Sequence, residues 1–422
     1  MQALFFLRHY NDIDHITPVI HKWVEQGHTC DVVLIGEGHF RNDYRVKYLT
    51  SLSPVRLAHI DEILSRKQIA RMRVQKLILH RYFNATAPAL VTRVLEKILG
   101  PQKRSDFWQR IAQTLLQRSF ADREPGVVVF DWISSNSVLP VEFVQIMVKA
   151  AGDRGLGSVS LPHGDSPHAN SLLRIDELRI EPNEKFAAAR IFDRVVVPNE
   201  LCASRYRPFV ENSAIAVLGS ARYCDEWLAK LDTILPPSPI QADPDKLKLV
   251  MFLRKRDFSI FWDEVHRVIQ LLTAFPGVDL IVKAHTRGGW WQPLSRNRAL
   301  RQLKNVRFVA SEIHSKHLLD WADAVIDIAT SMSYESVKKN QPVLAADYLH
   351  AGISTVGVYL PESVLNCRDD VYALVKHLLQ EGCDDFYISA HRQKFLDEII
   401  DVPDADVLPR FVKLLELLAG DL

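Results

Sequence analysis

Hydroxyl groups and a carboxylate gather within residues 325–337, which read Val-Ile-Asp-Ile-Ala-Thr-Ser-Met-Ser-Tyr-Glu-Ser-Val. The pattern predicts a buried strand, a tight turn and the start of a helix. A helix start directs backbone N–H groups and the positive end of the helix dipole outward, which suits an anion. Thr330, Ser331 and Ser333 add hydroxyl donors, and Glu335 lies one turn into the helix, where a carboxylate can bind a ribose hydroxyl pair. The segment therefore predicts a phosphate-bearing ligand, and a nucleotide above all.

Basic side chains follow two other predicted strands in the same half of the chain. Arg254 follows strand 247–253, and strand 279–283 ends in Lys283, with His285 just beyond it. In open parallel sheets, ligands bind outside the carboxyl ends of the strands. We therefore expect these cations and the hydroxyl-rich turn to converge on one phosphate group.

The N-terminal half offers candidate bases at its own predicted strand ends. Asp14 and His15 follow the first strand, Asp131 follows a later one, and His163 follows the next. Imidazole and carboxylate groups in such loops are candidate general bases, and His163 leads, with the other three as helpers or competitors. The alternative for Asp14 and Asp131 is that each caps the helix after it. No metal is expected, because no ligand spacing demands one.

The elements that must position these residues alternate along the chain. Short apolar runs between helical patterns predict an α/β fold with parallel sheets. A proline-rich stretch at 235–246 is expected to be a hinge linker. It separates an N-terminal domain, residues 1–234, from a C-terminal domain, residues 247–422, which closes with helices from about residue 371. The predicted strands are 4–7, 31–35, 127–130, 158–161, 195–197 and 215–218, then 247–253, 279–283, 306–309, 324–327 and 342–345.

Residues 66–123 break this alternation. They carry thirteen Lys and Arg against three acids, a net charge of +10, with apolar residues at helical spacing. This predicts a basic helical insertion, about residues 62–124, in the N-terminal domain. One interpretation is a solvated helical face, and the other is a peripheral contact with anionic membrane lipid or an anionic acceptor. Nucleic acid is not expected, because neither aromatic platforms nor a binding motif accompany the charge.

The composition is that of a globular protein, and the formal net charge of only +1 does not favour binding to nucleic acid. No run of about 18 apolar residues predicts a membrane span, and the N-terminus reads as a strand rather than a signal peptide. Five scattered cysteines without a CxxC pair favour a reduced, cytoplasmic protein without a structural metal. A peripheral position at the inner face of the cytoplasmic membrane is compatible with the basic insertion.

Four short motifs resemble those of a known enzyme group. Val282-Lys-Ala-His285 is similar to the first part of a Lys-x-His-Pro motif, with Thr286 in place of the proline, and Thr330–Ser333 resembles a Ser/Thr-Ser motif before a helix. Leu161-Pro-His-Gly164 resembles a His-Gly pair that acts as catalytic base, and Leu218–Trp227 a Gly-x-x-Arg segment entering a hinge. The group is the GT-B transferases of bacterial surface polysaccharides that use cytidine nucleotides, namely CDP-glycerol glycerophosphotransferases and CMP-sugar glycosyltransferases.

The resemblance implies two doubly wound Rossmann-like domains that face each other across a cleft. It implies a transferase that moves a sugar or polyol phosphate from a CMP- or CDP-activated donor to an oligosaccharide or polysaccharide acceptor. Arg254, Lys283 and His285 would neutralise the departing phosphate, and no metal or other cofactor is implied.

Two alternatives remain open. The continuation Met332–Glu335 is closer to the pattern of UDP-N-acetylglucosamine 2-epimerases, which makes a nucleotide-sugar epimerase or hydrolase on the same fold the alternative enzyme. The epimerases' N-terminal Gly-Thr-Arg-Pro-Glu is absent, however. A non-catalytic scaffold in polysaccharide assembly is the alternative from a different class.

Overall fold

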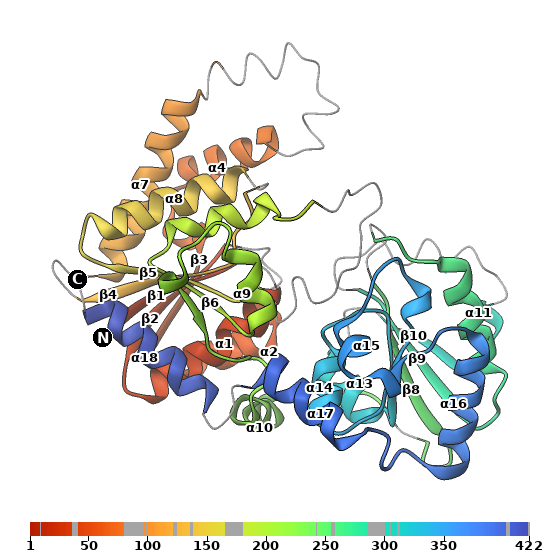
Figure 1. The fold of residues 1–422 in the computed structure, drawn as a ribbon. Coiled ribbons are helices and arrows are strands. Elements are labelled where there is room, and N and C mark those ends of the chain that lie inside the picture. Colours follow the sequence, from red (N-terminus) through yellow and green to blue (C-terminus); the bar gives the residue numbers. More distant parts are fainter. Residues whose placement is uncertain are drawn as a thin grey trace. The chain divides into compact units, whose positions relative to one another are not determined.

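A computed structural model describes most of the chain, and its described residues fall into two compact units (Figure 1). Unit 1 comprises Met1–Gly164, Pro182–Leu235 and Asp404–Leu422, and unit 2 comprises Asp165–Glu181 and Pro236–Pro403. The described residues are 1–8, 10–35, 41–79, 97, 100–120, 125–135, 138–164, 180–241, 243–254, 258–285, 300–303, 305–309, 313–401 and 406–420.

Unit 1 is built on a seven-stranded parallel sheet with the order β3-β2-β1-β4-β5-β6-β7. The inner strand β1 is buried along its length and mostly apolar, as is typical of a parallel sheet covered on both faces. The order reverses between β1 and β4, and the carboxyl ends of such a pair are where open α/β sheets bind ligands. The strands are β1 (Gln2–Leu7), β2 (Thr29–Leu34), β3 (Val55–His59), β4 (Gly126–Asp131), β5 (Gly157–Leu161), β6 (Arg194–Val197) and β7 (Ile215–Val217).

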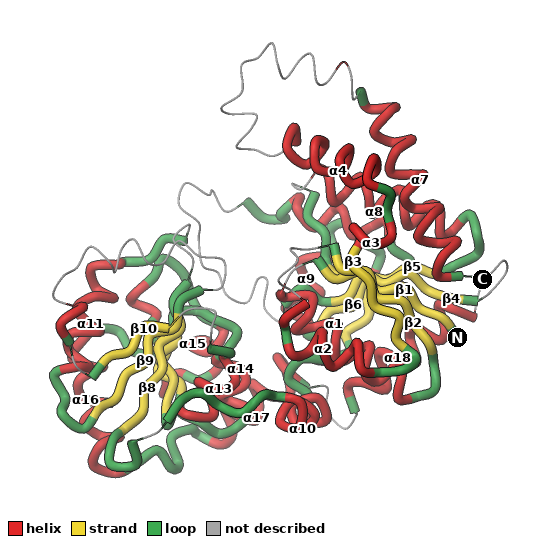
Figure 2. Tube along the Cα trace, turned by 180° about the vertical axis from the view of Figure 1, so that it is seen from behind, coloured by secondary structure: helices red, strands yellow, loops and turns green. Residues whose placement is uncertain are grey.

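Helices cover both faces of this sheet, and Figure 2 shows the two helical layers from behind. One core contains Trp23, Trp227 and Phe411, and the core on the opposite face contains Trp108 and Phe143. The helices and 3-10 turns of unit 1 are α1 (Tyr10–Glu25), α2 (Tyr44–Ser51), α3 (Ile60–Ile63), α4 (Arg66–Leu79), α7 (Pro101–Ser119), α8 (Val138–Gly152), η2 (Glu184–Ile191), α9 (Glu200–Tyr206), η3 (Asn212–Ala214), α10 (Asp225–Ile234) and α18 (Val407–Gly420).

The last helix, α18, packs on unit 1, which differs from the predicted C-terminal domain 247–422. Its apolar side, with Phe411 and Leu415, joins the core between α1 and the sheet. The approach is close, since a Cβ at Gly157 of β5 would lie 2.4 Å from the carbonyl oxygen of Leu418. Sequence periodicity predicts such a helix but not the unit that it packs against.

The described part of the basic insertion consists of α4 and α7. Helix α7 packs against α8, and its Trp108, Ile111 and Leu115 enter the core while its charged residues remain outside. Most of the segment between the two helices lies outside the described residues. None of the helices in the described ranges is long and apolar enough to cross a membrane.

Unit 2 is built on a five-stranded parallel sheet with the order β10-β9-β8-β11-β12, which reverses between β8 and β11. Its core lies mainly between the sheet and helices α11 and α16. The strands are β8 (Leu247–Phe252), β9 (Val278–Lys283), β10 (Val306–Val309), β11 (Ala324–Asp327) and β12 (Val343–Ala345). The helical segments are α11 (Trp262–Thr273), η4 (Leu300–Gln302), α13 (Ser315–Trp321), α14 (Ser333–Lys338), η5 (Asp347–Leu349), α15 (Thr355–Tyr359), η6 (Pro361–Ser363), α16 (Arg368–Glu381), α17 (Ser389–Phe395) and the π-helical η7 (Leu396–Ile400).

Candidate functional site

Four charged or titratable side chains meet at the point where the order of the unit 1 sheet reverses. Arg8 follows β1, Asp131 is the last residue of β4, and His163 lies two residues beyond the end of β5. Asp12 lies in the first turn of α1. Three neighbouring parallel strands thus deliver these groups to one edge of the sheet, as expected for a binding site.

His163 is oriented by Asp131. Nδ1 of His163 lies 2.6 Å from Oδ2 of Asp131, whose side chain is fully buried. A carboxylate accepts a proton but does not donate one, so Nδ1 carries the hydrogen and Nε2 of the neutral ring has the lone pair. Asn11 supports this tautomer, because its amide nitrogen lies 3.3 Å from Nε2. This pairing of an imidazole with a buried carboxylate is the arrangement of a general base.

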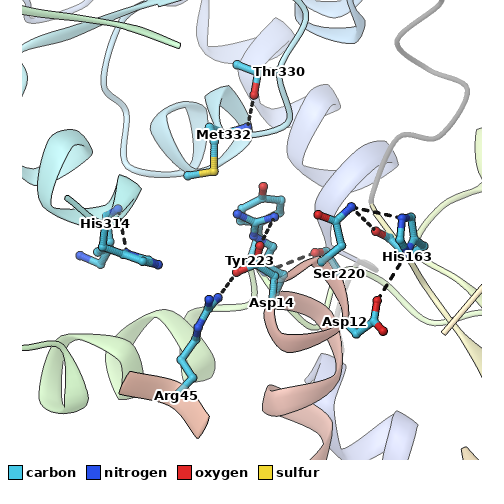
Figure 3. Close-up of polar contacts among 12 residues, drawn as sticks. Asp12, Asp14, Arg45, His163, Ser220, Tyr223, His314, Thr330 and Met332 are labelled. Carbon is cyan, nitrogen blue, oxygen red and sulfur yellow. Dashed lines mark hydrogen bonds and ion pairs between the residues drawn. The ribbon is translucent and has the colours of Figure 1, made fainter. Parts of the chain in front are cut away.

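A second buried carboxylate lies on the same side of the imidazole. Oδ1 of Asp12 is 3.6 Å from Nδ1 of His163, as Figure 3 shows, and the Asp12 side chain is fully buried. The backbone N–H of Arg8 donates to Oδ2 of Asp12 at 2.5 Å. The Arg8 guanidinium contacts Asp131 and donates to the carbonyl oxygen of Trp132 at 2.9 Å. Burial lowers the pKa of Arg8, and Asp12 opposes that shift.

Sequence reasoning selected Asp14 and His15 near this position but missed Asp12 and Arg8. Helix α1 begins at Tyr10, so Asp12 and Asp14 are separated by about 200° around the helix. Only one of them can therefore point at the strand ends, and it is Asp12. The sequence alone could not decide between the two aspartates, because the choice depends on the residue at which α1 begins.

Asp14 belongs to an ion-pair cluster of its own. It pairs with Arg45, as Figure 3 shows, and lies 3.3 Å from Nη1 of Arg222. Asp43 also pairs with Arg45, through both of its carboxylate oxygens. Burial raises the pKa of Asp43 to about 6 and lowers that of Arg45 to about 9. His15 is buried, and burial followed by the charges of Arg222 and His163 holds its pKa well below the usual value, so His15 lies near His163 as well. The structure therefore does not place Asp14 with Asp131 and His163.

Two groups of side chains in the described ranges are close enough together to hold a metal ion. One consists of Asp12, Asp131 and His163, and the other of His21, Glu25 and Glu226. A cation from the chain contacts acidic members of each: Arg8 in the first group, and Lys22 in the second.

In unit 2, the hydroxyl-rich turn between β11 and α14 is held by its own side chains. The N–H of Thr330 donates to Oδ1 of Asp327 at 2.8 Å, and the N–H of Met332 donates to the Thr330 hydroxyl oxygen at 3.3 Å (Figure 3). The Ser333 hydroxyl donates to the carbonyl oxygen of Thr330. Ala329 has a positive φ of 53°, a strained conformation that is common at ligand sites. An anion that accepts from these N–H groups has to displace the Asp327 carboxylate or the Thr330 hydroxyl, which already accept from them.

Arg254, after β8, makes no ion pair with any residue that the structure describes. Its Nε is shielded from water and has no hydrogen-bond partner. Its guanidinium lies 4.9 Å from the centre of the Phe258 ring, and no ion pair within 4.0 Å is found among the described residues. Burial lowers its pKa, while the nearby charge of Asp327 raises it. A partly buried guanidinium of this kind is stabilised when a ligand supplies an anion.

The other cations and Glu335 have partners within the chain. Nζ of Lys283, a buried residue at the end of β9, donates to the carbonyl oxygen of Ile313 at 2.6 Å. His285 follows two residues later and is partly exposed. Glu335 is buried, and its Oε1 lies 3.0 Å from Nζ of Lys339. A ribose at Glu335 would thus compete with an existing ion pair. Ser331 lies in the same turn as Thr330 and Ser333.

Comparison with known proteins establishes the fold. No family model matches the sequence, and no curated protein matches it. UDP-GlcNAc 2-epimerase from Neisseria meningitidis, solved bound to UDP-GlcNAc, is 12% identical with a TM-score of 0.56, over 94% of this chain and 99% of its own. UGT89C1 from Arabidopsis thaliana, complexed with UDP, is 11% identical with a TM-score of 0.57, over 99% of each chain. The glycotransferase of kitacinnamycin is 12% identical with a TM-score of 0.51, over 99% of this chain and 98% of its own.

These similar structures have the GT-B fold, and the present chain has it too. The predicted fold class, an α/β protein with two Rossmann-like domains, is thereby confirmed. The similarity includes both an epimerase and a glycosyltransferase, so the fold does not distinguish between the two reactions.

Proposed function

We propose that this protein is a nucleotide-sugar enzyme, and that it transfers a glycosyl or polyol-phosphate group from a nucleotide-activated donor to an acceptor hydroxyl. The observation that carries the proposal is the contact between His163 and the buried carboxylate of Asp131 at the reversal of the sheet order. A base at this position is needed to activate an acceptor hydroxyl.

The chemistry follows from the orientation of the ring. Nε2 of His163 takes the proton of the acceptor hydroxyl as its oxygen forms a bond to the transferred group. The bond between that group and the donor phosphate breaks, and the electron pair leaves with the nucleotide. In unit 2, Arg254 stabilises the negative charge on the leaving phosphate, because its guanidinium makes no ion pair with a described residue and its Nε has no hydrogen-bond partner. The proposed general base thus belongs to unit 1, and the proposed phosphate-binding cation belongs to unit 2.

The donor base has two candidates. The motifs around Lys283 and Thr330 favour a cytidine nucleotide, whereas the similar structures from Neisseria meningitidis and Arabidopsis thaliana contain UDP-GlcNAc and UDP. Thermal unfolding with CMP, CDP, UMP, UDP and GDP separates them, since a ligand of the folded state raises the midpoint temperature. Stabilisation by no nucleotide at millimolar concentration would contradict the proposal.

The alternative reaction is epimerisation or hydrolysis of the donor, and the similarity to the epimerase structures favours it specifically. The two reactions differ in whether an acceptor is needed. Each nucleotide sugar that stabilises the protein is incubated with and without oligosaccharide acceptors, and products are analysed by mass spectrometry and NMR. Transfer requires an acceptor and gives a heavier glycan. A donor that changes its stereochemistry alone would replace the transferase proposal with the epimerase.

The acceptor is proposed to be a surface oligosaccharide or polysaccharide under assembly at a membrane. The support is that Arg66, Lys67 and Arg73 of α4 are exposed, which is compatible with an anionic lipid surface. Binding to anionic lipid vesicles tests this part of the proposal.

A further inference from the structure

Arg8 links two buried carboxylates in unit 1. Its backbone N–H and its Nε lie 2.5 and 3.8 Å from Oδ2 of Asp12, and its Nη2 contacts Oδ1 of Asp131. The side chains of both aspartates are fully buried, whereas that of Arg8 is 12% exposed. Two carboxylates removed from water require a compensating cation. The chain itself supplies that cation.

The same groups have the composition of a divalent-metal site. Ligand atoms of Asp12, Asp131 and His163 all lie within 4.8 Å of one another. Carboxylate oxygens and an imidazole nitrogen are common ligands of first-row divalent metals. In this chain, however, a guanidinium contacts the two carboxylates.

The choice of cation decides what His163 can do. A divalent ion would neutralise both carboxylates and would bind a ring nitrogen. Arg8 supplies a single positive charge, so the cluster has a net charge of −1 while the imidazole is neutral. A ring that binds no metal keeps the Nε2 lone pair available to accept a proton.

We propose that Arg8 is a positioning residue that takes the place of a metal ion between Asp12 and Asp131, so that His163 accepts protons instead of ligating a metal. This inference rests on the proposed role of His163 as a base. It predicts that the site becomes a metal site when the guanidinium is removed.

The first test measures Mn²⁺ binding and needs no enzymatic activity. Titrations followed by electron paramagnetic resonance compare the wild type with Arg8→Ala and Arg8→Gln. We expect each variant to gain one Mn²⁺ site, at least tenfold tighter than any binding there in the wild type. The double variant Arg8→Ala/Asp12→Asn loses it again. The group around His21 provides the same background in all samples.

Arg56→Ala is the matched control. Arg56 also pairs with a buried carboxylate, since its Nε donates to Oδ1 of Asp31 at 2.8 Å. Asp31 belongs to neither group of metal-ligating side chains in the described ranges. We therefore expect this variant to gain no Mn²⁺ site. An unchanged Mn²⁺ titration in a folded Arg8→Gln variant, verified by circular dichroism, would overturn the inference, as would a gain that persists in the double variant.

The second test measures activity. If Arg8 acts as a fixed cation, guanidinium ions at millimolar concentration restore the transfer rate of Arg8→Ala at least tenfold and do nothing for His163→Ala. Arg8→Lys retains more activity than Arg8→Ala, because it keeps the charge. Absence of transfer in the wild type would contradict the proposed function but would leave the Mn²⁺ result standing. A gained Mn²⁺ site without guanidinium rescue would reject the positioning role.

Discussion

Nδ1 of His163 lies 2.6 Å from Oδ2 of Asp131, although 32 positions separate the two residues in the chain. The contact follows from the pairing of β4 with β5, in which Asp131 is in register with Leu161. His163 is two residues beyond that partner, at the carboxyl edge of the sheet, where the chain has left the strand. A buried strand end thus fixes the carboxylate, and the following loop brings the imidazole to it.

His163→Ala is expected to lower the transfer rate by about 10²- to 10⁴-fold, the usual contribution of a general base. Asp131→Asn should also lower it strongly, because an amide no longer fixes the ring tautomer. Donor affinity should stay unchanged in both, since the proposed phosphate contacts lie in unit 2. Rates come from steady-state kinetics, and His21→Ala serves as a control histidine from α1. Full activity in His163→Ala would exclude this residue as the base.

The sequence was sufficient for the strand ends that carry the proposed base, but it did not predict β3 (Val55–His59) or the side chains that face one another at those ends. Apolar runs followed by polar residues correctly indicated where His163 and Asp131 lie. The choice between Asp12 and Asp14 depended on the starting residue of α1, which propensities do not fix to within two residues. The partners of Asp14 come from segments far away in the chain, so their effect on it required the tertiary structure.

Arg254→Ala is expected to weaken nucleotide binding about 10- to 100-fold, since a charged hydrogen bond to a phosphate contributes about 1.5–3 kcal/mol. Arg254 is partly buried near Asp327, whereas Arg267 on α11 is exposed and pairs with Glu264. Arg267→Ala is therefore the matched control and should bind nucleotide as the wild type does. Isothermal titration calorimetry gives both affinities. Equal affinities for the two variants would show that Arg254 does not bind the phosphate.

Exposed cations on α4 are expected to bind anionic lipid. The triple variant Arg66→Glu/Lys67→Glu/Arg73→Glu should reduce sedimentation with phosphatidylglycerol vesicles at least tenfold, because each cation near such a surface contributes about 1 kcal/mol. Binding to phosphatidylcholine vesicles should be weak in every case. Lys376→Glu, an exposed change on α16 of unit 2, is the control. If the triple variant sediments as the wild type does, α4 is a solvated helical face.

Asp327 is expected to make the stability of the protein depend on pH. Replacement of its carboxyl group by an amide should remove that dependence. Burial raises the pKa of Asp327 to about 7, whereas an unfolded aspartate titrates near pH ~3.9. Between these values the folded state binds more protons than the unfolded state, so this group makes the free energy of unfolding fall as pH rises. The contribution becomes constant above about pH 7.

Asp327→Asn keeps an oxygen that can accept the N–H of Thr330 but has no charge to bury. The free energy of unfolding of the variant minus that of the wild type should therefore increase from about pH 4.5 to 7, by at most ~1.4 kcal/mol per pH unit, and then level off. Urea denaturation at several pH values measures this difference. A difference that is flat across the window, or that decreases with pH, would mean that Asp327 remains charged in the folded protein and that its carboxylate is compensated by Arg254.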